Sequence, residues 1–304
     1  MSAEAPPTID PVAAARWGNS PQNSSPWLHD EVGRRMEERL QWIKMQPQSW
    51  ADWEPVCGGL QTHTALARRY PGARCFVVEA APPRAQAAAR QIHKPWWSRA
   101  PWAGPAPRFE IPSDGCVQMV WANMALHMAA DPQALIKRWH SWLEVDGFLM
   151  FSCLGPDTLR ELRAGFRSLG WPPPAHEFTD MHDWGDMLVN SGFAEPVMDM
   201  ERITLSFDSP ERALAELRSL GRNLHIGRFA ALRGRRWREN LLQALRPQGQ
   251  SVAEPQPVAL TFEIIYGHAV KARARLSVKG ETSLSLDEMR RELRQGGRAP
   301  GGRP

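Results

Sequence analysis

The segment from Ser113 to Arg163 limits the possible folds of this chain more than any other. An apolar, β-prone run from Cys116 to Trp121 predicts a strand. Asp131 and Pro132 then provide an N-cap and a proline at the first helical position, and the apolar residues that follow recur at helical spacing. The continuously apolar run from Phe148 to Cys153 is typical of a strand buried on both faces of a parallel sheet. Strand, helix and buried strand in this order predict a right-handed βαβ unit.

Two longer motifs accompany this unit. Residues 151–163 read FSCLGPDTLRELR, and HDWGDML at 182–188 is followed by SGFAEPVMDME at 191–201. Over residues 113–220, and again over 261–268, the chain closely resembles the malonyl-carrier-protein O-methyltransferases of biotin synthesis. This group, the BioC family, belongs to the class I S-adenosylmethionine-dependent methyltransferases.

The resemblance implies an α/β fold with a Rossmann-like, seven-stranded, mostly parallel sheet and helices on both faces. The alternating patterns at 198–207 and 261–268 then correspond to its antiparallel end. The resemblance also implies S-adenosylmethionine as cofactor and a malonyl group on acyl carrier protein as methyl acceptor.

Length and composition define the expected domain organisation. The chain has 304 residues, with 42% hydrophobic and 23% charged residues, which is ordinary for a globular protein. We expect a flexible N-terminal arm over residues 1–26, one methyltransferase-like domain over 27–270, and a basic, largely disordered tail over 271–304. The sequence contains neither an apolar run of membrane-spanning length nor a secretory signal, so we expect a cytoplasmic protein without a membrane partner.

Residues 50–79 are expected to hold the cofactor. The pattern predicts a strand from Trp50 to Cys57, a turn, a helix from Leu60 to Tyr70, and a second strand over 74–78 that ends at Glu79. In the resembling family, an acidic residue and a glycine-rich turn follow the first strand, because glycines let the backbone approach the cofactor closely.

The matching residues in this chain are Glu54, Gly58 and Gly59, which the resemblance implies to be cofactor-binding. Glu79 has the position of a carboxylate that accepts hydrogen bonds from both ribose hydroxyls. The alternative for Glu79 is a solvated carboxylate at a strand end.

The cofactor motif departs from the family pattern at three positions. Val56 and Leu60 stand where outer glycines are expected, and a Cβ atom there would crowd the cofactor. Pro107 replaces an aspartate expected near the adenine and offers no acceptor side chain. The Pro- and Trp-rich loop over 94–107 either covers the site, stacking an aromatic ring on the adenine, or packs on the sheet edge. Its tryptophans are Trp96, Trp97 and Trp102.

Methyl transfer to a carboxylate depends on positioning, because the nucleophile is already charged. Asn123 and His127 follow the strand at 116–121, where open α/β sheets place their ligands, and are the candidate catalytic residues, with Asn123 also a candidate for cofactor binding. A capping or core role is the alternative for His127. Arg160 is the candidate for binding the malonyl carboxylate, against the alternative of a surface arginine paired with a nearby acid. The sequence shows no Ser-His-Asp set and no metal-ligand cluster, so no metal site is predicted.

The arginine-rich stretch from Arg222 to Arg238 has three interpretations: a solvated helix face, a dock for an acidic protein such as acyl carrier protein, or a nucleic-acid surface. The net charge of +4 is too small to favour nucleic acid. Two classes of function are therefore compatible with the sequence. One is an S-adenosylmethionine-dependent methyltransferase, and the other is a catalytically degenerate relative that acts as an interaction or assembly factor.

Overall fold

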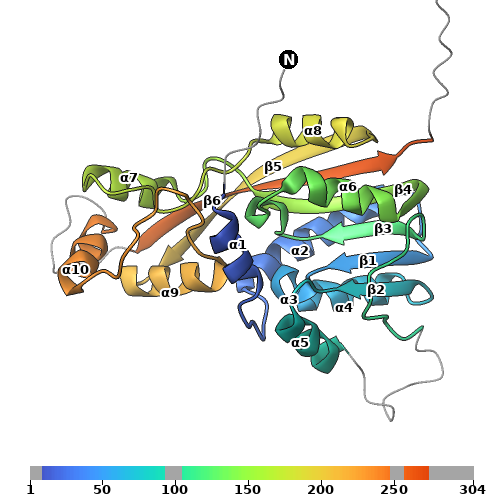
Figure 1. Cartoon of the computed structure of the whole chain (residues 1–304), viewed down its shortest axis with the longest axis horizontal. Coiled ribbons are helices and arrows are strands. Elements are labelled where there is room, and N and C mark those ends of the chain that lie inside the picture. Colours follow the sequence, from blue (N-terminus) through green and yellow to red (C-terminus); the bar gives the residue numbers. More distant parts are fainter. Residues whose placement is uncertain (1–8, 93–104, 247–256, 274–304) are drawn as a thin grey trace, which may run out of the picture. The chain divides into compact units, whose positions relative to one another are not determined.

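A six-stranded sheet forms the centre of the structure. The computed structural model describes residues 9–92, 105–246 and 257–273. The strand order is β2-β1-β3-β4-β6-β5 (Figure 1). The strands are β1 Ser49–Trp53, β2 Arg74–Val78, β3 Val117–Ala122, β4 Leu143–Leu154, β5 Phe193–Phe207 and β6 Val258–Lys271. Strands β1 to β4 run parallel, and β6 is antiparallel to both β4 and β5. The predicted α/β class and its antiparallel end are confirmed.

The expected seventh strand is absent from the described part of the chain. Beside β2, Arg108 makes a single parallel bridge with Phe76. The amide of Arg108 donates to the Cys75 carbonyl at 2.9 Å, and the Val77 amide donates to the Arg108 carbonyl at 2.8 Å. Prolines at 105, 107 and 112 surround this bridge, and a proline has no amide proton for a ladder. The count of seven strands is therefore not confirmed: the described residues form six strands, with one bridge beside β2.

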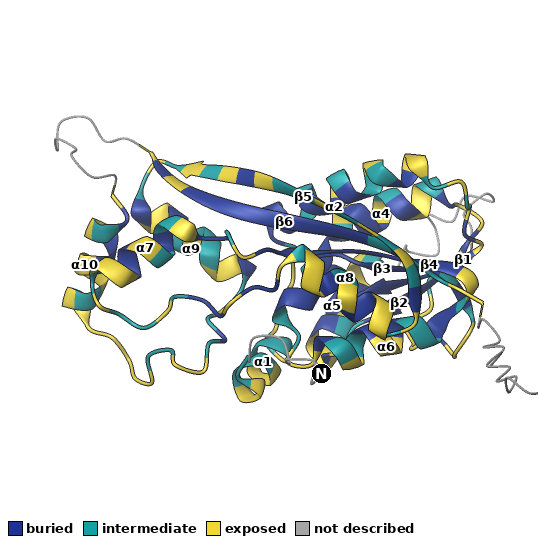
Figure 2. Ribbon diagram, turned by 90° about the horizontal axis from the view of Figure 1, so that it is seen from above, coloured by how far each residue is buried: buried dark blue, intermediate teal, exposed yellow. Residues whose placement is uncertain are grey.

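Helices cover both faces of the sheet. On one face lie α2 (Trp27–Arg39) and α4 (Leu60–Arg69), and on the other lie α6 (Pro132–Trp142) and α8 (Met181–Asn190) (Figure 2). Side chains alternate between the faces along each strand, so the core consists of two clusters, with Trp50 in one and Ala51 in the other. The Asp131 side chain caps α6 by accepting from the Ala134 amide at 2.9 Å, as the sequence predicts. No helix in these described ranges is long and apolar enough to cross a membrane.

The first strand ends earlier than its sequence suggests. Strand β1 stops at Trp53, and α3 (Pro55–Gly58) follows at once, so the predicted strand from Trp50 to Cys57 is corrected. Pro55 cannot donate to a ladder but fits the first position of a helix. Glu54 adopts a left-handed conformation with φ of 52°, which turns the chain between the two elements.

The remaining helices are α1 (Pro11–Gly18), α5 (Pro82–Ile92), α7 (Arg160–Ser168), α9 (Pro210–Leu220) and α10 (Arg235–Ala244). All but α1 add buried side chains to one of the two core clusters. Helix α1 forms within the segment expected to be a flexible arm. The chain divides into a unit of residues 1–272 and a second unit of residues 273–304, of which the structure describes only Arg273. The expected tail therefore lies almost wholly outside the described residues.

Gly267 permits the close pairing of β4 and β6. It lies opposite Phe151 in the register, and a Cβ atom at Gly267 would lie 2.1 Å from that ring. Phe151 is fully buried, so its ring has no free space to enter.

We predict that Gly267→Ala lowers the free energy of unfolding by about 1–3 kcal/mol, the usual cost of overpacking a core. Urea denaturation measures this change. Gly72→Ala is the matched control, since a Cβ atom at Gly72 would meet nothing within 4 Å. Equal losses in the two variants would contradict the packing argument.

Candidate active site

A cavity of about 360 Å³ lies where the first three strands end, and we call it the strand-end cavity. Glu54 follows β1, Ala80 follows β2, and Met124 and Ala125 follow β3. Open α/β sheets bind their ligands at the carboxyl ends of such strands. Trp17 of α1 lies on another wall of the same cavity.

Arg84 of α5 links the two predicted carboxylates at this end of the sheet. Its Nη2 donates to Oε1 of Glu54 at 3.0 Å, and its Nε lies 3.7 Å from Oε2 of Glu79. Glu79 Oε1 accepts from the Val56 amide at 2.8 Å, and the Glu79 side chain is 1% exposed. Glu54 and Arg84 therefore line the strand-end cavity, whereas Glu79 does not. Its ribose-binding role stays a prediction.

Burial raises the pKa of both carboxyl groups. Loss of water raises the pKa of Glu54, against the opposing charge of Arg84. Burial raises the pKa of Glu79 from 4.5 to about 8, although the hydrogen bond from Val56 acts in the opposite direction. A pKa of about 8 keeps Glu79 mostly protonated near neutral pH.

Asn123 holds the turn in place. Its Nδ2 donates to the His29 carbonyl at 2.7 Å and to the Gly58 carbonyl, and its Oδ1 accepts from Ser152 Oγ at 2.6 Å. Asn123 is 2% exposed and does not line the strand-end cavity. A Cβ atom at Gly58 would lie 2.9 Å from the Asn123 carbonyl, and Gly59 has φ of 138°. These residues shape the turn, so their predicted contacts with the cofactor stay predictions.

The two side chains expected to crowd the cofactor point elsewhere. Val56 is fully buried in the core, and Leu60 packs partly buried against the same cluster. Neither lines the strand-end cavity, and the turn residue that does is Cys57. Pro107 is also absent from the lining. The tryptophans of the 94–107 loop fall outside the described residues.

The N-terminal segment covers the turn and the strand-end cavity. Ser25 Oγ accepts from the Leu60 amide at 2.8 Å and donates toward the Val56 carbonyl at 3.2 Å. Asp10 caps α1, and its carboxylate pairs with Arg228 at 2.6 Å. The Asp10 amide also donates to the Leu224 carbonyl at 2.9 Å. Residues 221–234, the segment between α9 and α10, thus hold α1 over the cavity.

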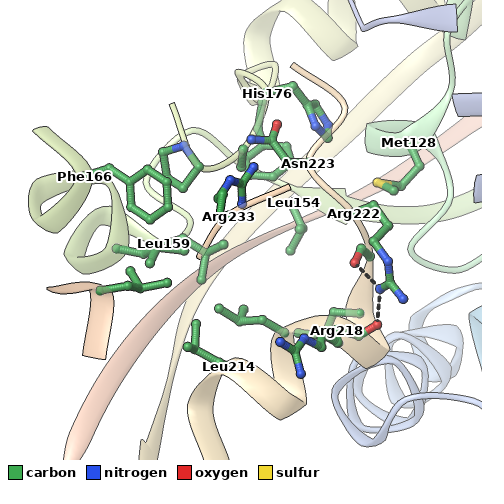
Figure 3. Close-up of a pocket in the computed structure, with 18 of the residues that line it drawn as sticks. Met128, Leu154, Leu159, Phe166, His176, Leu214, Arg218, Arg222, Asn223 and Arg233 are labelled. Carbon is green, nitrogen blue, oxygen red and sulfur yellow. Dashed lines mark hydrogen bonds between the residues drawn. The ribbon is translucent and has the colours of Figure 1, made fainter. Parts of the chain in front are cut away.

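A second and larger cavity, of about 580 Å³, lies between α7, α9 and α10, and we call it the arginine-rimmed cavity (Figure 3). Its lining is mainly apolar. The arginines in its lining are Arg218, Arg222, Arg233 and Arg238. Met128 and Leu220 line both cavities, so the two are neighbours across these shared residues, which we call the junction.

His127 and Arg160 lie in different surroundings. His127, in a short 3-10 helix (Leu126–Met128), lines the arginine-rimmed cavity but is 4% exposed, and its Nδ1 has no hydrogen-bond partner in the described chain. Burial, then the neighbouring His29 and His176, hold its pKa well below 6.5. Arg160 is exposed on α7, donates to Glu161 at 3.1 Å, and lines neither cavity. The structure therefore brings His127 to a cavity and leaves Arg160 outside.

Two site residues were missed by sequence reasoning. Arg84 sits in PPRAQAAARQI, a segment that shows only the ordinary pattern of an amphipathic helix. Cys57 was named as the end of the predicted first strand, yet its Sγ accepts from Arg84 Nη1 at 2.8 Å. Arg84 is recognisable as a site residue because it is buried between Glu54 and Glu79. That arrangement cannot be read from a sequence in which the three residues lie on separate segments.

Comparison with solved structures defines the class of fold. A Bacillus halodurans protein proposed to be a methyltransferase matches with a TM-score of 0.53 at 12% identity, over 80% of this chain and all of that one. The Bacillus subtilis YcgJ protein matches with a TM-score of 0.52 at 12% identity, over 79% and 99% of the two chains. At this identity the likeness concerns the fold alone, which is the Rossmann-like methyltransferase fold.

No protein-family model matches the chain, whereas curated relatives do. The malonyl-[acyl-carrier protein] O-methyltransferase of Gallionella capsiferriformans is 36% identical over 276 residues, or 85% of this chain and 89% of the relative. The enzyme of the same name from Laribacter hongkongensis is 37% identical over 260 residues, or 82% and 84% of the two chains. The chain belongs to the family of malonyl-[acyl-carrier protein] O-methyltransferases. The predicted resemblance and the methyltransferase class are confirmed, and the interpretation as a degenerate relative is not supported.

The raised pKa of Glu79 predicts a pH-dependent stability. The folded protein keeps the Glu79 proton up to about pH 8, whereas an unfolded glutamic acid loses it near pH 4.5. This residue should therefore lower the free energy of unfolding by up to about 1.4 kcal/mol per pH unit as the pH rises between these values. Urea denaturation at several pH values should show a smaller slope for Glu79→Gln. Parallel pH profiles for the two proteins would contradict the prediction.

The contact between Asp10 and Arg228 predicts that α1 helps to retain ligand in the strand-end cavity. Asp10→Asn keeps a capping side chain but removes the ion pair, so we expect about fivefold weaker binding of S-adenosylhomocysteine. Calorimetric titration measures the affinity. Asp208→Asn removes an exposed pair with Arg212 and serves as the control. Unchanged affinity in Asp10→Asn would show that the contact does not hold the cavity closed.

Proposed function

We propose that this chain transfers a methyl group from S-adenosylmethionine to the free carboxylate of a malonyl group on acyl carrier protein, as a cytoplasmic step of biotin synthesis. The observation that carries the proposal is the junction of the two cavities at Met128 and Leu220. One cavity lies over the strand ends and the other is apolar with a basic rim. We expect a methyl donor in the first cavity and an anionic acceptor in the second to approach each other at the residues that the two linings share.

The strand-end cavity fits a nucleoside cofactor by its place and its lining. Glu54 offers a carboxylate, Arg138 offers a cation, and Trp17 and Trp53 offer apolar surface. S-adenosylmethionine, when bound there, supplies a methyl carbon that bonds to the acceptor oxygen while the carbon–sulfur bond breaks and its electron pair stays on sulfur. Glu79 does not line this cavity, and its role in holding the ribose stays part of the proposal.

The protein residues then contribute position and exclusion of water rather than proton transfer. The acceptor carboxylate is already charged and needs no general base, so this chemistry assigns no proton transfer to the buried His127. Asn123 fixes the turn that forms the cavity wall. Arginines of the rim take the role in carboxylate binding that the sequence suggested for Arg160, because Arg160 lies outside the cavity.

Residues 222–238 are the proposed dock for the acidic carrier protein. Arg235, Arg236 and Arg238 are exposed on α10, and Ile226 and Leu232 are exposed apolar residues of the same stretch. Positively charged side chains around exposed apolar ones are complementary to a partner that carries negative charge and an apolar surface.

The direct test of the function is methyl transfer measured by mass spectrometry. Purified protein, S-adenosylmethionine and malonyl carrier protein should give a carrier heavier by one methyl group. Acetyl carrier protein, which lacks the free carboxylate, should give no product. Absence of transfer to the malonyl form, with the protein folded and the cofactor bound, would refute the proposal.

A charge reversal tests the dock separately. Arg236→Glu should raise the KM for malonyl carrier protein about tenfold, since a repulsive charge replaces an attractive one, and should leave the affinity for the cofactor unchanged. Arg68→Glu, an exposed arginine on α4, is the matched control for net charge. Equal increases in KM in the two variants would show that the carrier protein does not dock on residues 222–238.

A further inference from the structure

The junction of the two cavities sets a requirement for the acceptor. If the proposed function holds, we expect the acceptor carboxylate to lie near Met128 and Leu220, because these residues line both cavities. A carboxylate held among apolar side chains needs a cation with hydrogen-bond donors beside it. The question is which arginine is close to this junction.

The four arginines that line the arginine-rimmed cavity differ in their neighbours. The Arg233 guanidinium packs over the rings of Phe229 and Trp237, 4.5 Å from each centroid. Figure 3 shows Arg233 on the side of Phe166, and Arg222 on the side of Met128. Arg222 contacts a residue that lines the strand-end cavity. Its guanidinium lies 5.1 Å from the centroid of the Trp17 ring.

Arg222 is held in this place by backbone groups. Its Nη1 donates to the Gly221 carbonyl at 2.8 Å and to the Arg218 carbonyl at the end of α9. Gly221 itself lies against Met128, since a Cβ atom built there would be 3.3 Å from the Met128 methyl carbon. Within the described ranges, Arg222 forms no ion pair with an acid, so Nε and Nη2 are available for a carboxylate. These two groups form one edge of a planar fork that matches both oxygens of a carboxylate.

We propose that Arg222 binds the free carboxylate of the acceptor at this junction and makes the enzyme select malonyl over uncharged acyl groups. The proposal rests on the proposed function and goes beyond docking. The carrier protein binds the outer arginines whatever acyl group it bears, whereas Arg222 distinguishes the acyl groups themselves.

Equilibrium binding of malonyl and acetyl carrier protein separates these two effects. Measurements in the presence of S-adenosylhomocysteine allow binding without methyl transfer. Wild type should bind the malonyl form more tightly than the acetyl form by about tenfold to a hundredfold, the value of a charge-assisted pair. Arg222→Gln should lose this preference while its affinity for the acetyl form stays the same, and Arg222→Lys should keep part of it. Arg212→Gln, on α9 but in neither cavity lining, should keep all of it.

The outcomes distinguish the inference from the function on which it rests. If Arg222→Gln keeps the malonyl preference, or loses affinity equally for both carriers, Arg222 does not recognise the carboxylate although wild-type methyl transfer stands. If wild type neither prefers nor methylates the malonyl form, the proposed function itself fails, and the inference fails with it. Unfolding midpoints and S-adenosylhomocysteine affinity of the variants should match wild type, so that loss of the Trp17 contact is not mistaken for loss of recognition.

Discussion

The side-chain amide of Asn123 is the interaction on which the site depends. One buried amide joins the end of β3 to the main chain of α2, to the turn after β1 and to a hydroxyl of β4. A buried amide without partners would cost about 1–3 kcal/mol, so the native state is favoured only when all these segments are in place together. The wall of the strand-end cavity is therefore part of the same cooperative unit as the sheet.

Charge at the strand ends is arranged around one buried arginine. Arg84 lies between Glu54 and Glu79, and burial alone would disfavour the charged form of each carboxylate. A single cation cannot fully satisfy both acids at their observed distances of 3.0 and 3.7 Å. The arrangement leaves Oε2 of Glu79 and Nε of Arg84 without hydrogen bonds in the described structure. A polar ligand that supplied these bonds would relieve the unfavourable burial, which is a physical reason for a binding site here.

Sequence reasoning succeeded where the determining pattern is local. The strand at 116–121, the cap at Asp131 and the buried run at 148–153 follow from hydrophobic periodicity and neighbouring residues, and motif resemblance gave the family. It failed where the answer depends on how distant segments meet. Nothing local reveals that Arg84 reaches Glu54, that Val56 turns into the core, or that Arg222 rather than Arg160 borders a cavity. Prolines around Arg108 were visible in the sequence, and they could have indicated that the seventh strand would not form.

The attachment of α1 to residues 221–234 has a consequence for the order of events in turnover. The same short segment provides wall residues for one cavity and the anchor for the helix over the other. If carrier and nucleoside bind as proposed, occupancy of the two cavities is thermodynamically linked: a carrier that shifts this segment changes the affinity for the nucleoside, and the nucleoside changes the affinity for the carrier by the same factor. The contacts that would have to change include a half-buried ion pair, a backbone hydrogen bond and the packing of Arg222 on Trp17. On this proposal, release of the spent nucleoside is coupled to departure of the methylated carrier.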